Sequence, residues 1–277
     1  MADDILMLPA VWSTTELERR VSDIALAGGG ASTLAVAYEG RGVELFNFDA
    51  ERIAPIAPIA VNAISDGAFV DFGDAALTLF PAISEDAKLV GIVYGEGLVG
   101  PQQIDLPIET GGDVIGLCSR RTVFEEDGVL VLAYWTATNW ENLNHGVLSV
   151  NGDSFVWTPS EPTPRDGGGC TLPGNGDVIV SPAGTDAVVV DRPDQTYVVS
   201  LSDDGALTAR TFGGEDEVLG IRDGITVRAP VRPTAIAALG IPLGGGYPDG
   251  LIVLSGADGY RDKVVFVDAG GLSALAE

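Results

Sequence analysis

Short apolar runs separated by glycine- and aspartate-containing turns dominate this chain, and they constrain its fold more than any other feature. The clearest example lies near the C-terminus, where the apolar runs Leu251–Leu254 and Lys263–Val267 flank the turn Ala257–Gly259. Apolar, β-branched runs of this length between turn residues are typical of β-strands. Weaker versions of the same unit occur upstream, so the sequence predicts a chain built from repeated sheet units.

The units begin near Asp23, Val61, Asp113, Asp166 and Asp223. Repeats of roughly 40 to 60 residues, each with about four short strands, are typical of β-propellers. The sequence therefore predicts an all-β, single-domain β-propeller over residues 1–277, with about five four-stranded blades and six as the alternative. No segment has the character of an interdomain linker.

Two predictions concern the N-terminal region. Residues 5–12 contain Pro9 within an apolar run, which favours an edge strand that completes the last blade and closes the ring. Residues 13–21 have the Ser13 to Glu16 spacing of a capping box, so we expect one or two helical turns there.

The formal net charge is −25, from 40 acidic and 15 basic residues. Such a surface repels phosphate backbones, which argues against a nucleic-acid partner. It suits a protein in an aqueous setting and favours divalent cations such as calcium. No apolar run reaches the roughly 18 residues needed to cross a bilayer as a helix, so no transmembrane segment is predicted.

Two cysteines, Cys118 and Cys170, leave open a disulfide or two buried free thiols. Together with the single His145 they are too few for a Cys/His zinc cluster. No secretory leader is visible at the acidic start, which would fit a mature domain whose signal peptide has been removed.

Aspartates recur at or just before the first strand of each unit. First strands line the central channel of a propeller, so these carboxylates could form a ring of oxygen ligands for calcium. The alternative is ordinary turn chemistry, because aspartate beside glycine is common in turns. The candidates are Asp23, Asp66, Asp113, Asp166 and Asp223, with Asp258 in the acidic turn of the last unit.

Arg120 and Arg121 form an adjacent basic pair in an otherwise acidic chain, and they are candidate contacts for a phosphate group. Neighbouring strand residues point to opposite faces, so at most one of them is expected to face the channel. His145 is expected to have a structural role, since no second histidine exists to support it.

Several segments resemble the β-propeller phytases. In the last unit the resemblance rests on 238–240, 244–246 and the segment Tyr247-Pro248-Asp249-Gly250-Leu251, followed by an apolar strand and the turn at Asp258. The first unit is similar through Asp23–Leu26 and Val43–Phe48, and Gly116-Leu117-Cys118 resembles a blade start of that family.

The resemblance implies a periplasmic, cell-surface or secreted propeller that binds calcium in its channel and hydrolyses phosphomonoesters such as phytate. In such a site, calcium neutralises the phosphates and activates water, while lysine and arginine hold the remaining oxygens.

The chain departs from that family in three ways. It is about one blade shorter, and it has no counterparts of the active-site histidine and tyrosine of the third blade. The place of the cationic cluster is taken by Phe80–Ser84. We therefore predict a divergent, non-catalytic binding module for a phosphorylated small molecule or a cell-surface protein. The alternative is an active calcium-dependent phosphomonoester hydrolase.

Overall fold

The computed structural model describes residues 5–28, 32–121, 128–165, 167–172, 179–181, 184–193, 195–240, 247–258 and 261–276. The described chain is almost entirely β-structure, as the strand-like runs predicted. Its one helical element, η1 (Ala269–Ala276), is a 3-10 helix that follows the last strand. Within these ranges no helix has the length and apolar character required to span a membrane.

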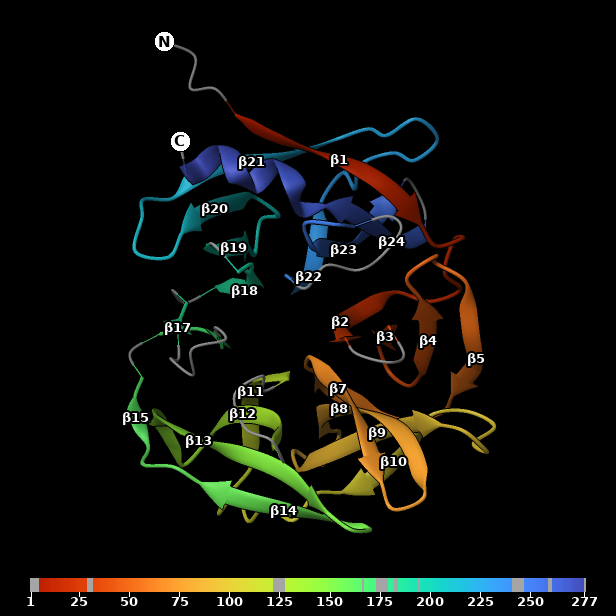
Figure 1. Cartoon of the computed structure of the whole chain (residues 1–277), viewed down its shortest axis with the longest axis vertical. Coiled ribbons are helices and arrows are strands. Elements are labelled where there is room, and N and C mark those ends of the chain that lie inside the picture. The colour runs from red at the N-terminus through yellow and green to blue at the C-terminus, as the bar shows by residue number, and fades with distance from the viewer. Residues whose placement is uncertain are drawn as a thin grey trace.

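The strands form successive antiparallel groups arranged around a centre (Figure 1). The first group contains β2 (Val21–Gly28), β3 (Thr33–Tyr38), β4 (Val43–Asn47) and β5 (Arg52–Ala57). The second contains β7 (Gly67–Phe72), β8 (Ala75–Ser84), β9 (Leu89–Gly95) and β10 (Gln102–Asp105), with β6 (Val61–Ile64) paired to the far end of β8.

The third group contains β11 (Val114–Arg121), β12 (Gly128–Thr136), β13 (Asn139–Asn151) and β14 (Ser154–Pro159), and β15 (Thr163–Pro164) pairs with β13. A two-stranded hairpin of β16 (Cys170–Thr171) and β17 (Ile179–Val180) follows. The fourth group contains β18 (Thr185–Asp191), β19 (Thr196–Ser202), β20 (Leu207–Thr211) and β21 (Glu217–Arg222).

The last group joins the two ends of the chain. β22 (Pro233–Leu239), β23 (Leu251–Asp258) and β24 (Arg261–Asp268) are extended by β1 (Leu6–Ser13) from the N-terminus. Residues 10–13 of β1 pair antiparallel with β24, where Ala10 lies opposite Val267, and residues 6–9 pair parallel with β21, where Leu6 lies opposite Leu219. No residue of β1 pairs with both strands, so each half of the N-terminal strand lies at the edge of a sheet, as predicted from Pro9.

The predicted helix at residues 13–21 was wrong. The backbone N–H groups of Thr14 and Leu17 donate to the carbonyls of Val264 and Asp262, at 2.9 Å each. These bonds continue the contact between β1 and β24, and Leu17 is 1% exposed. Tertiary pairing thus uses the donors that a local helix would have needed.

Hydrophobic clusters fill the spaces between neighbouring groups. The cluster between the fourth and fifth groups includes Val199, Leu254 and Leu8, and the cluster between the fifth and first includes Phe266 and Phe46. Similar clusters lie between the first and second groups and between the second and third. Strands at these contacts are buried on both faces, which explains their continuous apolar runs.

Candidate functional site

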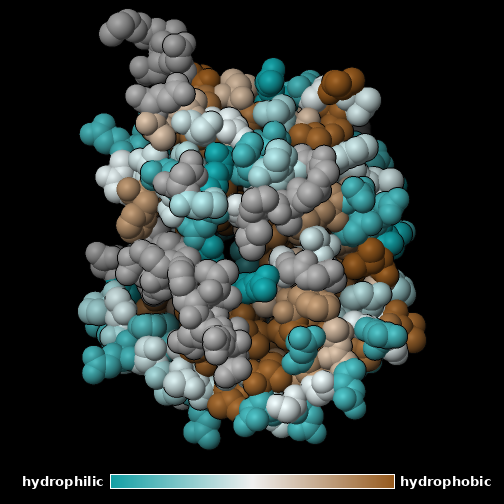
Figure 2. Space-filling model, viewed as in Figure 1, coloured by the Kyte–Doolittle hydropathy of each residue, from teal (hydrophilic) through white to brown (hydrophobic). Residues whose placement is uncertain are grey.

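A cavity of about 360 Å³ lies where the first strands of the groups converge. Its walls come from β2, the β6–β7 connection, β11, β16, β18 and β22, which surround the centre of the ring in Figure 1. Figure 2 shows hydrophilic residues around a hollow near the middle of the same face. The prediction that first strands line a central channel is therefore confirmed for the described strands.

Asp23 lies on β2 and is half-buried at the channel wall. Its Oδ1 accepts a hydrogen bond from the backbone N–H of Ile24, and its Oδ2 accepts one from Ile64, each at 2.9 Å. The second bond crosses from the first group to β6. Burial raises the pKa of the Asp23 carboxyl to about 7, and the charges of Asp186 and Asp66 act in the same direction.

Asp66 makes the corresponding hydrogen-bonded link from the second group back to the first. It lies between β6 and β7, and its Oδ1 accepts the backbone N–H of Leu26 on β2 at 2.8 Å. Just beyond this bond, Ala27 and Gly28 of β2 pair in parallel with the start of β7. Burial raises the pKa of Asp66 to about 7, although the positive charge of Arg120 opposes the shift. The two aspartates thus link neighbouring inner strands.

Asp186 is the third carboxylate at the channel, and the sequence analysis missed it. It lies on β18 and lines the cavity, and its pKa is raised by desolvation and then by the charge of Asp203. The fourth unit was expected to begin near residue 166, whereas β18 is the inner strand. The sequence contains a signal for Asp186, because this residue directly precedes the apolar run Ala187–Val190, as Asp23 directly precedes Ile24.

The other predicted carboxylates do not join this group where the structure describes them. Asp113 is exposed just before β11, and Asp223 is exposed in the loop after β21, where its Oδ1 accepts the backbone N–H of Ala229 at 2.9 Å. Asp166 and the side chain of Asp258 lie outside the described residues.

The described carboxylates do not form a calcium-type ligand set. Calcium takes six to eight oxygen ligands, but the described residues contain no group of three Asp, Glu, His or Cys side chains that could hold a metal ion. Both oxygens of Asp23 already accept backbone hydrogen bonds. The described part of the channel therefore fits calcium poorly.

Arg120 and Arg121 lie at the other end of the channel, where both line a small cavity of about 40 Å³. Arg120 forms an ion pair with Asp191, and its Nη1 donates to the Leu172 carbonyl at 3.0 Å. The Arg120 side chain therefore links β11 to β18 and to the residue that follows β16. Arg121 is exposed at the end of β11.

Cys118 and Cys170 form a disulfide, with 5.7 Å between their Cα atoms. The bond joins β11 to β16 at the channel wall. Beside it, the indole of Trp135 lies against Gly116, where any side chain would collide with the ring. The guanidinium of Arg165 covers the ring at 4.0 Å from its centroid. The ring thus has a packing role.

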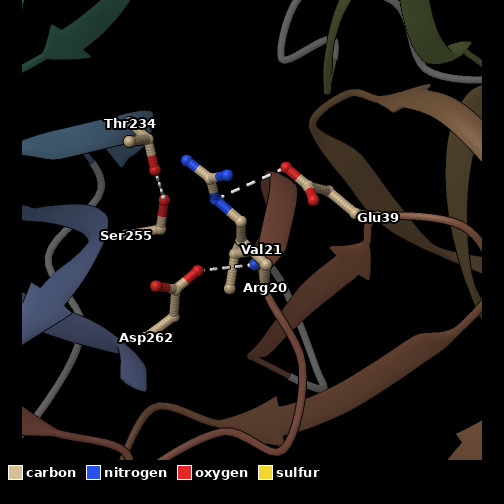
Figure 3. A network of polar contacts seen from close by, with 6 residues as sticks. All are labelled: Arg20, Val21, Glu39, Thr234, Ser255 and Asp262. Atoms are coloured by element: carbon tan, nitrogen blue, oxygen red, sulfur yellow. Dashed lines mark hydrogen bonds and ion pairs between the residues drawn. The ribbon is translucent and has the colours of Figure 1, made fainter. Parts of the chain in front are cut away.

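Figure 3 shows polar contacts where the fifth group meets the first, and one of them joins the two groups. The backbone N–H of Val21 donates to Asp262 Oδ2 at 2.7 Å, and the hydroxyls of Thr234 and Ser255 lie 3.1 Å apart. Thr234 also lines the cavity. An ion pair of Arg20 with Glu39, at 3.4 Å, lies on the surface beside them and contributes little stability.

Comparison with known proteins gives the fold. No model of a known protein family matches the chain, and no curated protein matches it. Among solved structures, a mutant of AofleA from Arthrobotrys oligospora, in which three arginines are replaced by alanine, is similar with a TM-score of 0.53 at 14% identity. The match covers 90% of this chain and 84% of that one.

Two glycoside hydrolases of the GH43 group are similar as well. The GH43_1 enzyme from Xanthomonas citri has a TM-score of 0.52 at 10% identity, over 93% of this chain and 89% of that one. CoXyl43, a β-xylosidase/α-arabinofuranosidase from a compost microbial metagenome, has a TM-score of 0.50 at 10% identity, over 92% of this chain and 94% of that one.

The chain has a β-propeller fold. The GH43 structures are propellers, and their similarity extends over nearly the whole chain. At this level of identity the likeness concerns the fold alone, so the phytase resemblance stays a prediction.

Proposed function

We propose that this protein is a divergent, non-catalytic five-bladed β-propeller that acts as a binding module in the periplasm, on the cell surface or in secreted form. In this proposal β1 completes the last blade and closes the ring. The disulfide is compatible with an oxidising compartment. The ligand would be a small molecule or a cell-surface protein.

The use of the channel carboxylates carries the non-catalytic part of the proposal. Asp23 and Asp66 accept backbone N–H groups across the contact between β2 and the β6–β7 segment. A carboxylate that holds two strands in register is restrained from moving toward a substrate. Arg120, the candidate phosphate contact whose charge acts on Asp66, is paired with Asp191.

Turnover assays test this proposal. The purified protein should release no phosphate from phytate or p-nitrophenyl phosphate with millimolar calcium, and no p-nitrophenol from aryl xylosides or arabinofuranosides. Asp66→Asn is the matched variant, because its amide oxygen can still accept the Leu26 N–H. Turnover by the natural protein that disappears in folded Asp66→Asn would overturn the proposal.

A second candidate function is hydrolysis in the channel. Half-buried carboxyls with pKa values near 7 are suited to general acid–base catalysis. Paired carboxyls cleave glycosides, which is the activity named for CoXyl43. The phytase resemblance instead favours phosphomonoester hydrolysis with calcium as cofactor. The same assays separate these two activities.

A further inference from the structure

A second cavity, outside the channel, lies on one face of the fourth group. It has a volume of about 450 Å³ and is lined from β18, β19 and β20, by Ser181 before β18, and by Asp216 before β21. This volume is in the range of cavities that hold small ligands. We call it the blade-four cleft.

The alternation of β19 places polar residues in the cleft. Tyr197, Val199 and Leu201 point into the hydrophobic cluster shared with the fifth group. The intervening residues Val198, Ser200 and Ser202 therefore point to the opposite face, and all three line the cleft. The cluster-facing side of this sheet is aliphatic and aromatic, whereas the cleft side is rich in hydroxyls.

The hydroxyls form a row across the three strands. Ser200 lies opposite Ala187 on one side and Thr208 on the other, while Thr185 lies opposite Ser202. The Ser202 hydroxyl is already used, donating to the adjacent turn at Asp204.

Ser200 and Thr208 contribute hydroxyls of this row that no other described residue bonds. Within the described part of the chain, the side-chain hydroxyls of Ser200 and Thr208 make no hydrogen bond, although both are half-buried. Each can donate one hydrogen bond and accept two. The cleft therefore offers both donors and acceptors to whatever occupies it.

A charged pair stands at one side of the cleft. Arg210 Nε lies 3.4 Å from Asp216 Oδ1, and both residues line the cavity. Because their charges cancel, the cleft has no excess cation for an anionic ligand and no excess carboxylate for a cationic one. The lining instead matches an uncharged ligand that carries many hydroxyl groups.

We infer that the blade-four cleft binds a neutral saccharide of one or two rings through the hydroxyls of Ser200 and Thr208 and the polar groups of Arg210 and Asp216. The inference rests on the proposed binding function but places the ligand outside the channel. It can therefore fail while the channel remains non-catalytic.

Titration calorimetry of the full chain with xylobiose, cellobiose and lactose tests the inference. We expect at least one to bind, and we expect Thr208→Val, which keeps the side-chain shape, to weaken that binding about tenfold. The matched control is Thr226→Val, at an exposed position outside the cleft, which should bind like the natural protein. Absence of binding for all three sugars, or equal binding by Thr208→Val, would overturn the inference.

Two further variants locate the bound sugar. Ala206→Trp adds bulk at the exposed edge of the cleft and should abolish binding even if Thr208→Val does not fold. Asp66→Asn alters only the channel and should leave binding unchanged. A sugar that is lost in Asp66→Asn but retained in Ala206→Trp would lie in the channel, contrary to the inference. Hydrolysis of a phosphate or glycoside substrate by the natural protein would contradict the proposed non-catalytic function and would not test this inference.

Discussion

The Asp66 carboxyl stabilises the contact between two strands, whereas its burial disfavours its charged form. Its hydrogen bond to Leu26 joins two strands, yet burial raises its pKa to about 7. An unfolded aspartate titrates near pH 4. Between about pH 4 and 7 Asp66 therefore binds more protons in the folded protein than in the unfolded chain, and its contribution to the free energy of unfolding falls as the pH rises.

Replacing Asp66 by Asn should remove much of this pH dependence. The amide oxygen can accept the Leu26 N–H without a charge, so Asp66→Asn should unfold at a higher temperature than the natural protein at about pH 8, with little difference at about pH 4. A pKa that is higher by one pH unit in the folded state corresponds to about 1.4 kcal/mol. Thermal unfolding followed by circular dichroism measures this, and an equal loss of stability at both pH values would contradict it.

Tyr247 is a second residue whose burial lowers the stability of the fold, here through its hydroxyl group. Its ring is buried against Phe266 in the cluster between the fifth and first groups, and its hydroxyl has no hydrogen-bond partner among the described residues. Burial raises the pKa of this phenol, and the charges of Asp49 and Asp268 raise it further. A buried, unsatisfied hydroxyl costs about 1–3 kcal/mol.

Tyr247→Phe should therefore raise the free energy of unfolding by about 1 kcal/mol. The control is Tyr38→Phe, since the hydroxyl of Tyr38 donates to the buried carboxylate of Glu44, and its loss should lower stability. Urea unfolding of both variants measures the difference. Destabilisation of Tyr247→Phe to the same extent as Tyr38→Phe would show that the Tyr247 hydroxyl has a partner.

At the scale of elements, the contact between the third group and β16 differs from the others. Its cluster comprises Cys118, Ala133, Trp135, Leu143, Cys170 and Leu172, and is the smallest among the described residues. The disulfide lies within it and closes a loop with a sequence separation of 52. Here the covalent bond supplements a small hydrophobic contact.

Replacing both cysteines by serine should lower the free energy of unfolding by about 4 kcal/mol, from the chain entropy released in the unfolded state. Urea unfolding of the Cys118→Ser/Cys170→Ser protein, compared with the natural protein under a dithiol reductant, measures this. The reduced natural protein should be destabilised similarly. Unchanged stability in both would show that the disulfide does not hold this contact.

β1 is the element that joins the two ends of the chain. Leu8 is fully buried in the cluster that β1 shares with the fourth and fifth groups, whereas its neighbour Met7 is 44% exposed. Leu8→Ala should lower the free energy of unfolding by about 2–5 kcal/mol, and Met7→Ala should change it little. Equal effects on urea unfolding would contradict the role of β1 in the core.

The sequence predicted strands well where they are buried on both faces, as in Leu251–Leu254. It failed at residues 13–21, because the contacts with β24 that occupy the backbone donors there are far away in the chain. It also missed Asp186, because the hairpin of β16 and β17 moves the start of the inner strand beyond the expected repeat. Register between distant strands depends on packing that a local pattern does not contain.

At the scale of the whole molecule, the candidate site is distributed over strands that meet only in the folded ring. Asp23 and Asp66 could be predicted because each lies at the start of an inner strand or just before it. Their link to backbone N–H groups of the neighbouring strand could not, since it depends on how the groups dock. The channel is thus acidic, as expected, but two of its described carboxylates, Asp23 and Asp66, bond to the scaffold.

A crystal structure of the protein grown with millimolar calcium would test the structural role of the channel carboxylates most directly. We predict Asp23 hydrogen-bonded to the backbone of Ile24 and Ile64, Asp66 bonded to Leu26, and no ion between the two carboxylates. A calcium ion bridging Asp23 and Asp66, with either aspartate released from its backbone partner, would contradict this structural role and favour the calcium-dependent hydrolase.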